Sequence, residues 1–176
     1  MALLKKTFSV LGSGKATALA SLLFKFDGID MISMDEFDRE GIKQHDQVIN
    51  CLKRRGRQLV LKTPNYFLAE SDSPNVDCVI LVINADSANT NLSKVLSEAA
   101  EYSENIIVLV DKMDEVGWSE EVFRATVKRL GPAAEGISAI PFSSSTGDNT
   151  VELSSNSSWH TDPTLLEALE ARFSSS

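Results

Sequence analysis

The sequence has few cysteines and histidines, and this scarcity excludes several kinds of site. Cys51 and Cys78 are the only cysteines, which are too few for a disulfide framework, and neither has a second Cys or His at the spacing of a zinc site. We expect Cys78, which lies in an apolar run, to be a small core residue. His45 and His160 stand alone in the sequence, and we expect both at the surface.

Long apolar runs are also missing. No stretch approaches the roughly 20 residues that span a membrane as a helix. The apolar stretch at the start, within Met1–Lys6, is too short for a signal peptide. We therefore expect a reduced, intracellular protein, cytoplasmic with the nucleus as the alternative, and no membrane partner.

The sequence has fewer basic than acidic residues. The 176 residues include 25 acidic and 17 basic side chains, for a formal net charge of −8. This balance disfavours a nucleic-acid backbone as the main partner. The one dense basic run is Lys53-Arg54-Arg55-Gly56-Arg57. Such a run is typical of the solvated end of a helix, where positive charge suits the helix dipole; contact with RNA or a ribosome is the alternative.

The length suits one domain with one hydrophobic core, so residues 1–176 are interpreted as a single domain. Expected strands and helices alternate, which predicts an α/β fold with a mainly parallel sheet and helices on both faces, in three layers. The strands are expected at 7–11, 58–62, 76–83, 105–110 and 137–142. The helices are expected at 15–26, 33–39, 44–55, 91–102, 119–130 and 165–173, with Ser119 and Thr164 as N-caps, and a polar loop is expected at 143–162.

Ligands of such sheets bind at the carboxyl ends of the strands. This rule alone points to four loops: Gly12–Lys15, Lys62–Tyr66, Asp111–Asp114 and Ser143–Ser145.

The first of these loops resembles a phosphate-binding loop, in which glycines let backbone N–H groups wrap the phosphates and a Lys and a Ser/Thr follow. The strict spacing fails, because the first glycine position counted back from Lys15 holds Ser9. Alternatively, Gly12 is that glycine and the loop is three residues short. Ala16 stands where the hydroxyl that binds Mg²⁺ belongs, and Thr17 comes one position too late. A glycine-rich helix start with a surface lysine is an equally good interpretation.

The second pair of loops resembles a guanine-binding site. Asp111-Lys112-Met113-Asp114 follows an expected buried strand, where guanine-specific GTPases carry Asn-Lys-x-Asp. Lys112 and Asp114 suit stacking on the base and accepting its N–H groups. Asp111 does not suit the base edge, because a carboxylate offers only acceptors. Ser143-Ser144-Ser145 suits a loop that presents N–H groups to the base. An ordinary charged turn is the alternative for Asp111–Asp114, and four residues alone do not decide between the two. An ordinary serine-rich turn explains Ser143–Ser145 equally well.

The order of these loops, together with the second half of the chain, resembles the GTP-binding domain of eukaryotic elongation factor 1-alpha and its translational GTPase relatives. The resemblance is strong from Val76 to Phe173 and weaker before. The matching segments are Asp77–Val82, Ile107–Asp114, Ala139–Ser143, Gly147-Asp148-Asn149, Trp159 and Thr164–Leu169, with Ser13-Gly14-Lys15 and Gly28-Ile29-Asp30 in the first half. This resemblance implies a P-loop NTPase-like fold, and it implies that the family's second and third domains are absent from this chain.

The departures from the family concern the chemistry. Its Asp-x-x-Gly motif, which contacts Mg²⁺ and the γ-phosphate, aligns best with Lys62-Thr63-Pro64-Asn65, and its catalytic histidine falls on Tyr66. Arg55-Gly56-Arg57-Gln58 lacks the Mg²⁺-binding threonine of the first switch region. The stretch between this first switch region and the second one, which contains the Asp-x-x-Gly motif, is too short for the family's usual β-hairpin by roughly a strand and a turn. Each such loss costs about 2–4 kcal/mol of transition-state stabilisation, so we expect no hydrolysis.

We therefore expect a pseudo-GTPase that serves as a protein-interaction module, with no catalytic residue, no metal and no cofactor. Two alternatives stay open: a protein that binds GTP or GDP without turnover, and a weak GTPase linked to translation or its quality control. A protein partner is expected, and a ribosome or translation factor is the alternative. Any retained nucleotide contact would come from Gly12, Ser13, Gly14, Lys15, Thr17, Lys112, Asp114, Ser143 and Ser144.

Overall fold

The computed structural model describes residues 2–175. The strands are β1 (Leu4–Gly12), β2 (Val60–Lys62), β3 (Tyr66–Glu70), β4 (Cys78–Asn84), β5 (Ile106–Asp111) and β6 (Ser138–Pro141). The helices are α1 (Lys15–Lys25), α2 (Met31–Glu40), α3 (His45–Arg54), α4 (Leu92–Ala100), α5 (Glu120–Lys128) and α6 (Leu165–Ser174), with short 3₁₀ turns η1 (Pro132–Ala134) and η2 (Ser155–Ser157).

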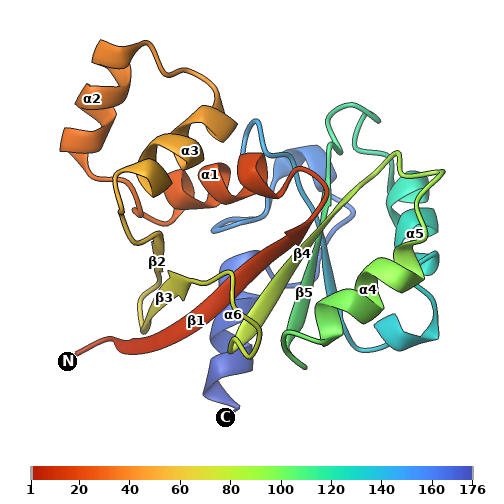
Figure 1. Ribbon diagram of the computed structural model, residues 1–176. Coiled ribbons are helices and arrows are strands. Elements are labelled where there is room, and N and C mark those ends of the chain that lie inside the picture. The colour runs from red at the N-terminus through yellow and green to blue at the C-terminus, as the bar shows by residue number, and fades with distance from the viewer. Residues whose placement is uncertain (1, 176) are drawn as a thin grey trace.

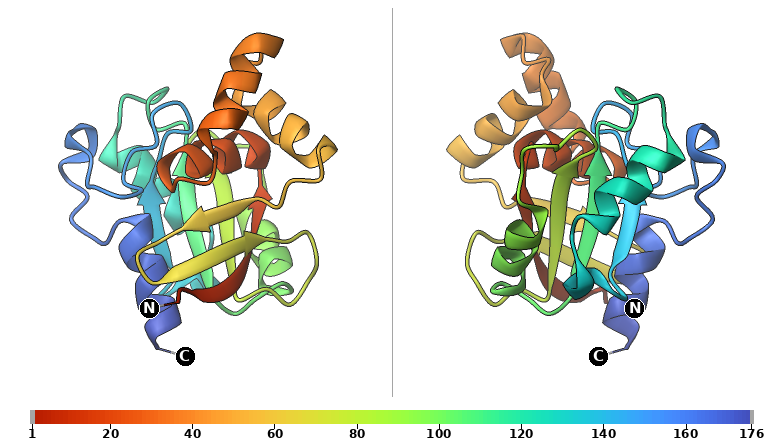
Figure 2. Two further views of the ribbon diagram at one scale, coloured as in Figure 1. Left: turned by 90° about the vertical axis from the view of Figure 1, so that its left-hand side faces the viewer. Right: turned by 90° about the vertical axis from the view of Figure 1, so that its right-hand side faces the viewer.

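The six strands form one sheet in the order β2-β3-β1-β4-β5-β6. Five strands run parallel and the edge strand β2 is antiparallel to β3. One apolar core lies between the sheet and α1, α3 and α6, and a second lies under α4 and α5 on the other face (Figures 1 and 2). The expected α/β class, with a mainly parallel sheet and helices on both faces, is confirmed.

The central strands follow directly from their sequences. Nearly every residue of β4 and β5 is buried, as expected for apolar, β-branched runs that are covered on both faces of a parallel sheet. The two expected N-caps are also present. The side chain of Ser119 accepts from the N–H of Val122, and Thr164 forms a reciprocal capping box with Glu167. In the described chain, no helix combines the length and apolar character that a membrane crossing requires.

Strand β3 corrects the expectation that this chain lacks room for the β-hairpin. β2 and β3 form a hairpin in which Lys62 pairs with Phe67 and Val60 with Ala69. β3, Tyr66–Glu70, is only five residues long and directly follows the turn at Pro64-Asn65, and it is stabilised by pairing with both β1 and β2. The seven residues that connect β3 to β4 are the short segment here.

The connection from β3 to β4 is short because the two strands are staggered. Glu70 ends β3 beside Phe8, and Cys78 begins β4 beside the same residue. Residues 71–77 therefore cross β1 without a helix, although parallel crossovers usually need a dozen or more residues. Two contacts fix this crossing: Ser71 N–H donates to the carbonyl of Phe8 (2.8 Å), and Asp77 accepts from the N–H and hydroxyl of Thr7 (2.8 and 2.9 Å).

The far end of β1 stays paired with β4 up to its last residue. Gly12 lies opposite Val82, and the N–H of Ser13 donates to the carbonyl of Val82 over 3.0 Å. Gly12 has φ 102°, and a Cβ there would lie 2.0 Å from the Val82 oxygen. Only a residue without a side chain allows the two strands to approach so closely at this conformation.

Replacing this glycine is expected to be costly. Gly12→Ala adds overpacking against backbone, typically about 1–3 kcal/mol, to the left-handed strain of about 1–2 kcal/mol. Gly41→Ala is the matched control, because Gly41 has φ 69° and nothing within 4 Å of its Cβ position. Urea unfolding of both variants measures the difference, and equal losses would contradict the close β1–β4 approach.

Candidate functional site

The turn between β1 and α1 is too short to wrap a phosphate. β1 ends at Gly12 and α1 begins at Lys15, so only Ser13 and Gly14 connect them. Ser9, the first position of the strict phosphate-loop spacing, lies inside β1, where its hydroxyl donates to the carbonyl of Ser71. The structure therefore favours the shortened-loop interpretation. The Ser13 N–H is bonded to Val82, which removes one donor that a phosphate would need.

The remaining residues of this motif lie at the helix start. Gly14, at φ 67°, precedes α1 and has no side chain with which to cap it. Lys15 is exposed and Thr17 is half-buried on the first turn of α1. The helix N-terminus carries partial positive charge, so this charge and the exposed ammonium of Lys15 are present without a phosphate-wrapping loop.

The loops after β5 and β6 are joined by the buried side chain of Asp111. Its Oδ1 accepts from the N–H groups of Lys112 (2.7 Å) and Ser144 (2.8 Å), and its Oδ2 accepts from the hydroxyl of Ser144 (2.5 Å). Gly14 is close by, because a Cβ on it would lie 4.0 Å from Asp111 Oδ2. Asp111 therefore faces the protein and ties the loops together, and its carboxylate is not turned to a base.

The other residues expected to contact a base differ in their exposure. Lys112 has φ 63° and pairs with Glu115, with 3.6 Å between Nζ and Oε1. Asp114 is exposed, and within residues 2–175 its carboxylate has no hydrogen bond or ion pair. Ser143 is 1% exposed and its hydroxyl has no partner among the described atoms. The N–H of Ser144 is already used by Asp111, so this loop presents fewer donors than expected.

The sequence-based alignment of the Asp-x-x-Gly motif with Lys62–Asn65 is wrong. Lys62-Thr63-Pro64-Asn65 forms the turn of the β2–β3 hairpin, where Asn65 accepts from the N–H of Leu4 at the start of β1. β2 is antiparallel to β3, so the carboxyl end of β2 lies near the amino end of β1, at the opposite end of the strands from the β1–α1 turn. The side chains of Thr63 and Asn65 donate to Glu170 of α6 instead (2.6 and 2.7 Å).

Tyr66, expected at the position of the catalytic histidine, belongs to the same wrong alignment. It opens β3, is 7% exposed and packs against Phe173, with ring centroids 5.0 Å apart. Its role is therefore in the core under α6.

The tetrad with the Asp-x-x-Gly spacing that follows the carboxyl end of β3 is Asp72-Ser73-Pro74-Asn75. Asn75 has φ 66°, a left-handed conformation that glycine adopts freely and asparagine tolerates. The sequence signal was available, because this tetrad directly precedes the expected strand 76–83. Asp72, Glu70, Lys53 and Lys15 line a cavity of about 50 Å³, far below the roughly 300–1,000 Å³ of ligand pockets.

Lys53 from α3 forms ion pairs with both carboxylates of this cavity. Its ammonium lies 3.4 Å from Glu70 Oε1 and 3.3 Å from Asp72 Oδ2. Burial raises the pKa of Glu70 above its ordinary value, and the charge of Lys53 opposes that shift. No group of three or more His, Cys, Asp or Glu side chains suited to a metal occurs among residues 2–175.

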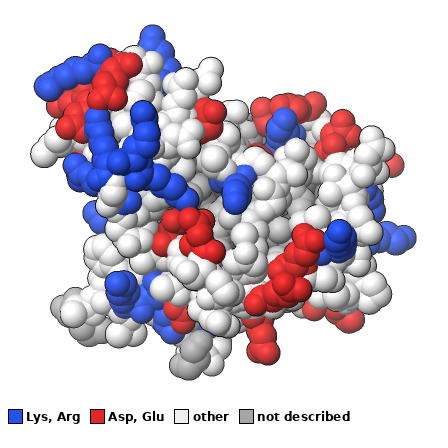
Figure 3. Space-filling model, in the orientation of Figure 1, with Lys and Arg blue, Asp and Glu red and all other residues white. Residues whose placement is uncertain are grey.

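The basic run that ends α3 is occupied by ion pairs within the chain. Arg55 pairs with Glu36 and Glu40 of α2, and Arg57 pairs with Asp30. Figure 3 shows Lys and Arg gathered over α2 and α3 with Asp and Glu beside them. This arrangement supports the interpretation of the run as the solvated end of a helix.

His160 corrects the expectation of a surface histidine. It is 5% exposed, lies against Phe123 and Trp159, and its Nε2 has no partner in the described structure. Burial lowers its pKa below the ordinary 6.5, with Asp162 opposing the shift. The neighbouring apolar rings come from α5 and the loop after β6, so no local pattern around His160 in the sequence revealed its burial.

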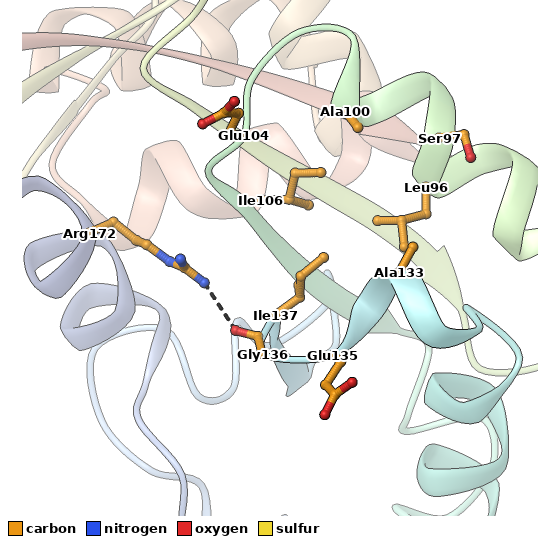
Figure 4. Close-up of a pocket in the computed structure, with 10 residues that line it drawn as sticks. All are labelled: Leu96, Ser97, Ala100, Glu104, Ile106, Ala133, Glu135, Gly136, Ile137 and Arg172. Atoms are coloured by element: carbon orange, nitrogen blue, oxygen red, sulfur yellow. Dashed lines mark hydrogen bonds between the residues drawn. The ribbon is translucent and has the colours of Figure 1, made fainter.

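A larger cavity lies at the other edge of the sheet, away from the β1–α1 turn (Figure 4). It measures about 490 Å³ and lies between α4, η1 and α6. Leu96, Ile106 and Ile137 make its wall apolar, and Arg172 donates to the carbonyl of Gly136 over 3.3 Å. None of the residues expected to contact a nucleotide lines it.

Comparisons with known proteins agree with this description of the fold. No protein-family model matches the chain. Elongation factor 1-alpha of Neurospora crassa is 28% identical, with 90% of this chain and 47% of the relative covered. That of Plasmodium falciparum is 27% identical, with 90% and 46% covered. The chain thus spans about half the length of the curated relatives it matches.

Solved structures agree in fold. The structure of Sup35 complexed with GDP matches with a TM-score of 0.74 at 21% identity, over 96% of this chain and 45% of that one. The Saccharomyces cerevisiae Ski7 GTPase-like domain bound to GTP matches with a TM-score of 0.69 at 18% identity, over 97% and 50%. The resemblance to translational GTPase domains is therefore confirmed in sequence and in fold.

The length of the sequence alignments also agrees with the shortened loops. The alignment with the Neurospora crassa protein runs over 216 positions, whereas the chain has 176 residues. The relative therefore carries residues inside the matched region that have no counterpart here.

The Asp111 contacts predict a difference between two neighbouring aspartates. Asp111→Ala leaves the N–H and the hydroxyl of Ser144 unpaired, at about 1–3 kcal/mol for each group, so we expect a total loss of about 2–6 kcal/mol. Asp114→Ala removes an exposed carboxylate and should stay within about 0.5 kcal/mol of the native chain. Urea unfolding measures both, and a similar loss for the two variants would refute the tie between the loops.

Proposed function

We propose that this chain is a pseudo-GTPase: a translational GTPase-like domain that does not hydrolyse GTP and acts as a protein-interaction module. The observation that carries the proposal is the pairing of β1 with β4 through Gly12, since it leaves Ser13 and Gly14 as the whole phosphate turn. Phosphoryl transfer depends on positioning and on charge neutralisation around the phosphates. Neither is supplied by a two-residue turn.

The Mg²⁺ that such domains use does not fit the residues present. Ala16 has no hydroxyl, and both carboxylates near Lys15 are already paired with an ammonium. Mg²⁺ is usually held by one or two carboxylates, water and the phosphates of the substrate in octahedral geometry.

An exposed apolar surface on α2 supports the interaction role. Met31, Ile32 and Met34 are 80%, 67% and 40% exposed, while Phe37 and Ser33 hold the helix to the body. α2 projects from the rest of the molecule (Figure 1). Exposed apolar side chains gathered on one element are typical of interaction sites. A translation factor or the ribosome is the partner that the resemblance to elongation factor 1-alpha favours.

A second candidate function, binding of GTP or GDP without turnover, has its own observation. The loops after β5 and β6 stay joined by Asp111 and Ser144, and Asp114 stays exposed with a free carboxylate in the described structure. The loops after β5 and β6, which would hold a base, thus keep more of the expected contacts than the β1–α1 turn, which would hold phosphates.

Calorimetric titration with GTP and GDP, with and without Mg²⁺, tests the proposal. We expect no Mg²⁺-dependent binding, because the phosphate turn and the metal ligands are missing. Under the second candidate, weak Mg²⁺-independent binding appears and is lost in Asp114→Ala and in Lys15→Ala. Micromolar binding of GTP that requires Mg²⁺ would overturn both candidates.

The interaction role predicts site-selective cross-linking. A photo-reactive amino acid at position 32 of α2 should give a discrete adduct in an extract of the native host, because Ile32 is exposed within an apolar surface. The same probe at position 98 of α4 is the control, since Glu98 is exposed among charges. Equal labelling from both positions, or no adduct from position 32, would count against α2 as the docking element.

A further inference from the structure

Lys53 lies where the carboxyl end of β3 meets α3. Its ammonium is within 3.4 Å of a carboxylate oxygen of both Glu70 and Asp72. The Glu70 side chain is 11% exposed, whereas that of Asp72 is 77% exposed. A half-buried carboxylate next to a second one is unfavourable unless a cation lies between them.

These carboxylates lie on the side of the fold where the metal ligands of a GTPase are expected. Asp72 holds the first position of the Asp-x-x-Gly spacing, and Lys15 lines the same small cavity. The donor set nevertheless does not fit Mg²⁺, since the only two carboxylates that line this cavity are both bound by an ammonium. A second cation here would meet the positive charges of Lys53 and Lys15.

We propose that the ammonium of Lys53 substitutes for the divalent cation of this fold, so that α3 is held against the end of β3 without a metal. The inference goes beyond the proposed function, because it holds whether or not the chain docks on a partner or binds a nucleotide.

The placement of Lys53 on α3 explains why a side chain can do this. Val48, Ile49, Cys51 and Leu52 bury the inner face of α3, and α3 packs against α1. This packing fixes the last turn of α3 beside β3. Burial by itself lowers the pKa of Lys53, but the charges of Glu70 and Asp72 outweigh burial and raise it. The ammonium is therefore stabilised in its charged form.

Arg54 and Arg55 provide a useful contrast on the same turn of helix. Arg55 pairs with α2, and Arg54 is exposed with no ion pair among residues 2–175. Removing the charge of Arg54 changes the net charge of the chain as much as removing that of Lys53, and it leaves Glu70 and Asp72 paired.

The test compares thermal unfolding of the native chain, Lys53→Gln and Arg54→Gln in EDTA and in millimolar MgCl₂. We expect the native chain and Arg54→Gln to unfold at the same temperature in both buffers. In EDTA, Lys53→Gln should unfold roughly 2–4 °C lower, because two carboxylates then face each other without a cation. MgCl₂ should raise the midpoint of Lys53→Gln alone.

A double variant separates charge from packing. Lys53→Gln with Asp72→Asn removes one of the two facing carboxylates, so it should recover part of the lost midpoint and lose the response to Mg²⁺. The proposal is overturned if Mg²⁺ stabilises the native chain as much as Lys53→Gln, or if the double variant recovers nothing. Neither result would bear on the nucleotide titration, so failure here is distinguishable from failure of the pseudo-GTPase proposal.

Discussion

The pairing of β1 with β4 up to Gly12 is the constraint on which the rest of this edge depends. In a phosphate loop the backbone leaves the strand early and its N–H groups turn inward around an anion. Here the backbone stays in the sheet, the Ser13 N–H is bonded to Val82, and α1 begins two residues after the strand. The close approach at Gly12 leaves no space for the chain to bulge. The N-terminus of α1 therefore carries a partial positive charge, but no loop of N–H groups surrounds the position of a phosphate.

The loops after β5 and β6 and the segment after β3 are held by different contacts. On the side of β5 and β6, the buried carboxylate of Asp111 accepts three hydrogen bonds and keeps two loops together. On the side of β3, the ammonium of Lys53 from α3 forms ion pairs with the carboxylates of Glu70 and Asp72. Both arrangements stabilise the scaffold by contacts within the chain.

The sequence predicted most of the fold because the central strands are long apolar runs and the helices have clear caps. The runs at 76–83 and 105–110 and the caps at Ser119 and Thr164 each indicated one structure. Strand β3 was missed because it is only five residues long and follows a turn, so it gives no long apolar run, and its pairing with β1 and β2 joins residues distant in sequence. That omission misplaced the Asp-x-x-Gly position at Lys62 and hid Asp72. The burial of His160 and the pairing of Lys53 depend on residues distant in sequence, which local patterns do not reveal.

Amide hydrogen exchange at Ser13, followed by NMR, tests the central claim most directly. If β1 remains a paired strand through Gly12, this amide exchanges slowly, and neither its protection nor its chemical shift changes when GTP and Mg²⁺ are added. Fast exchange in the free protein, with a large shift and new protection on adding GTP and Mg²⁺, would show that the segment opens into a working phosphate loop.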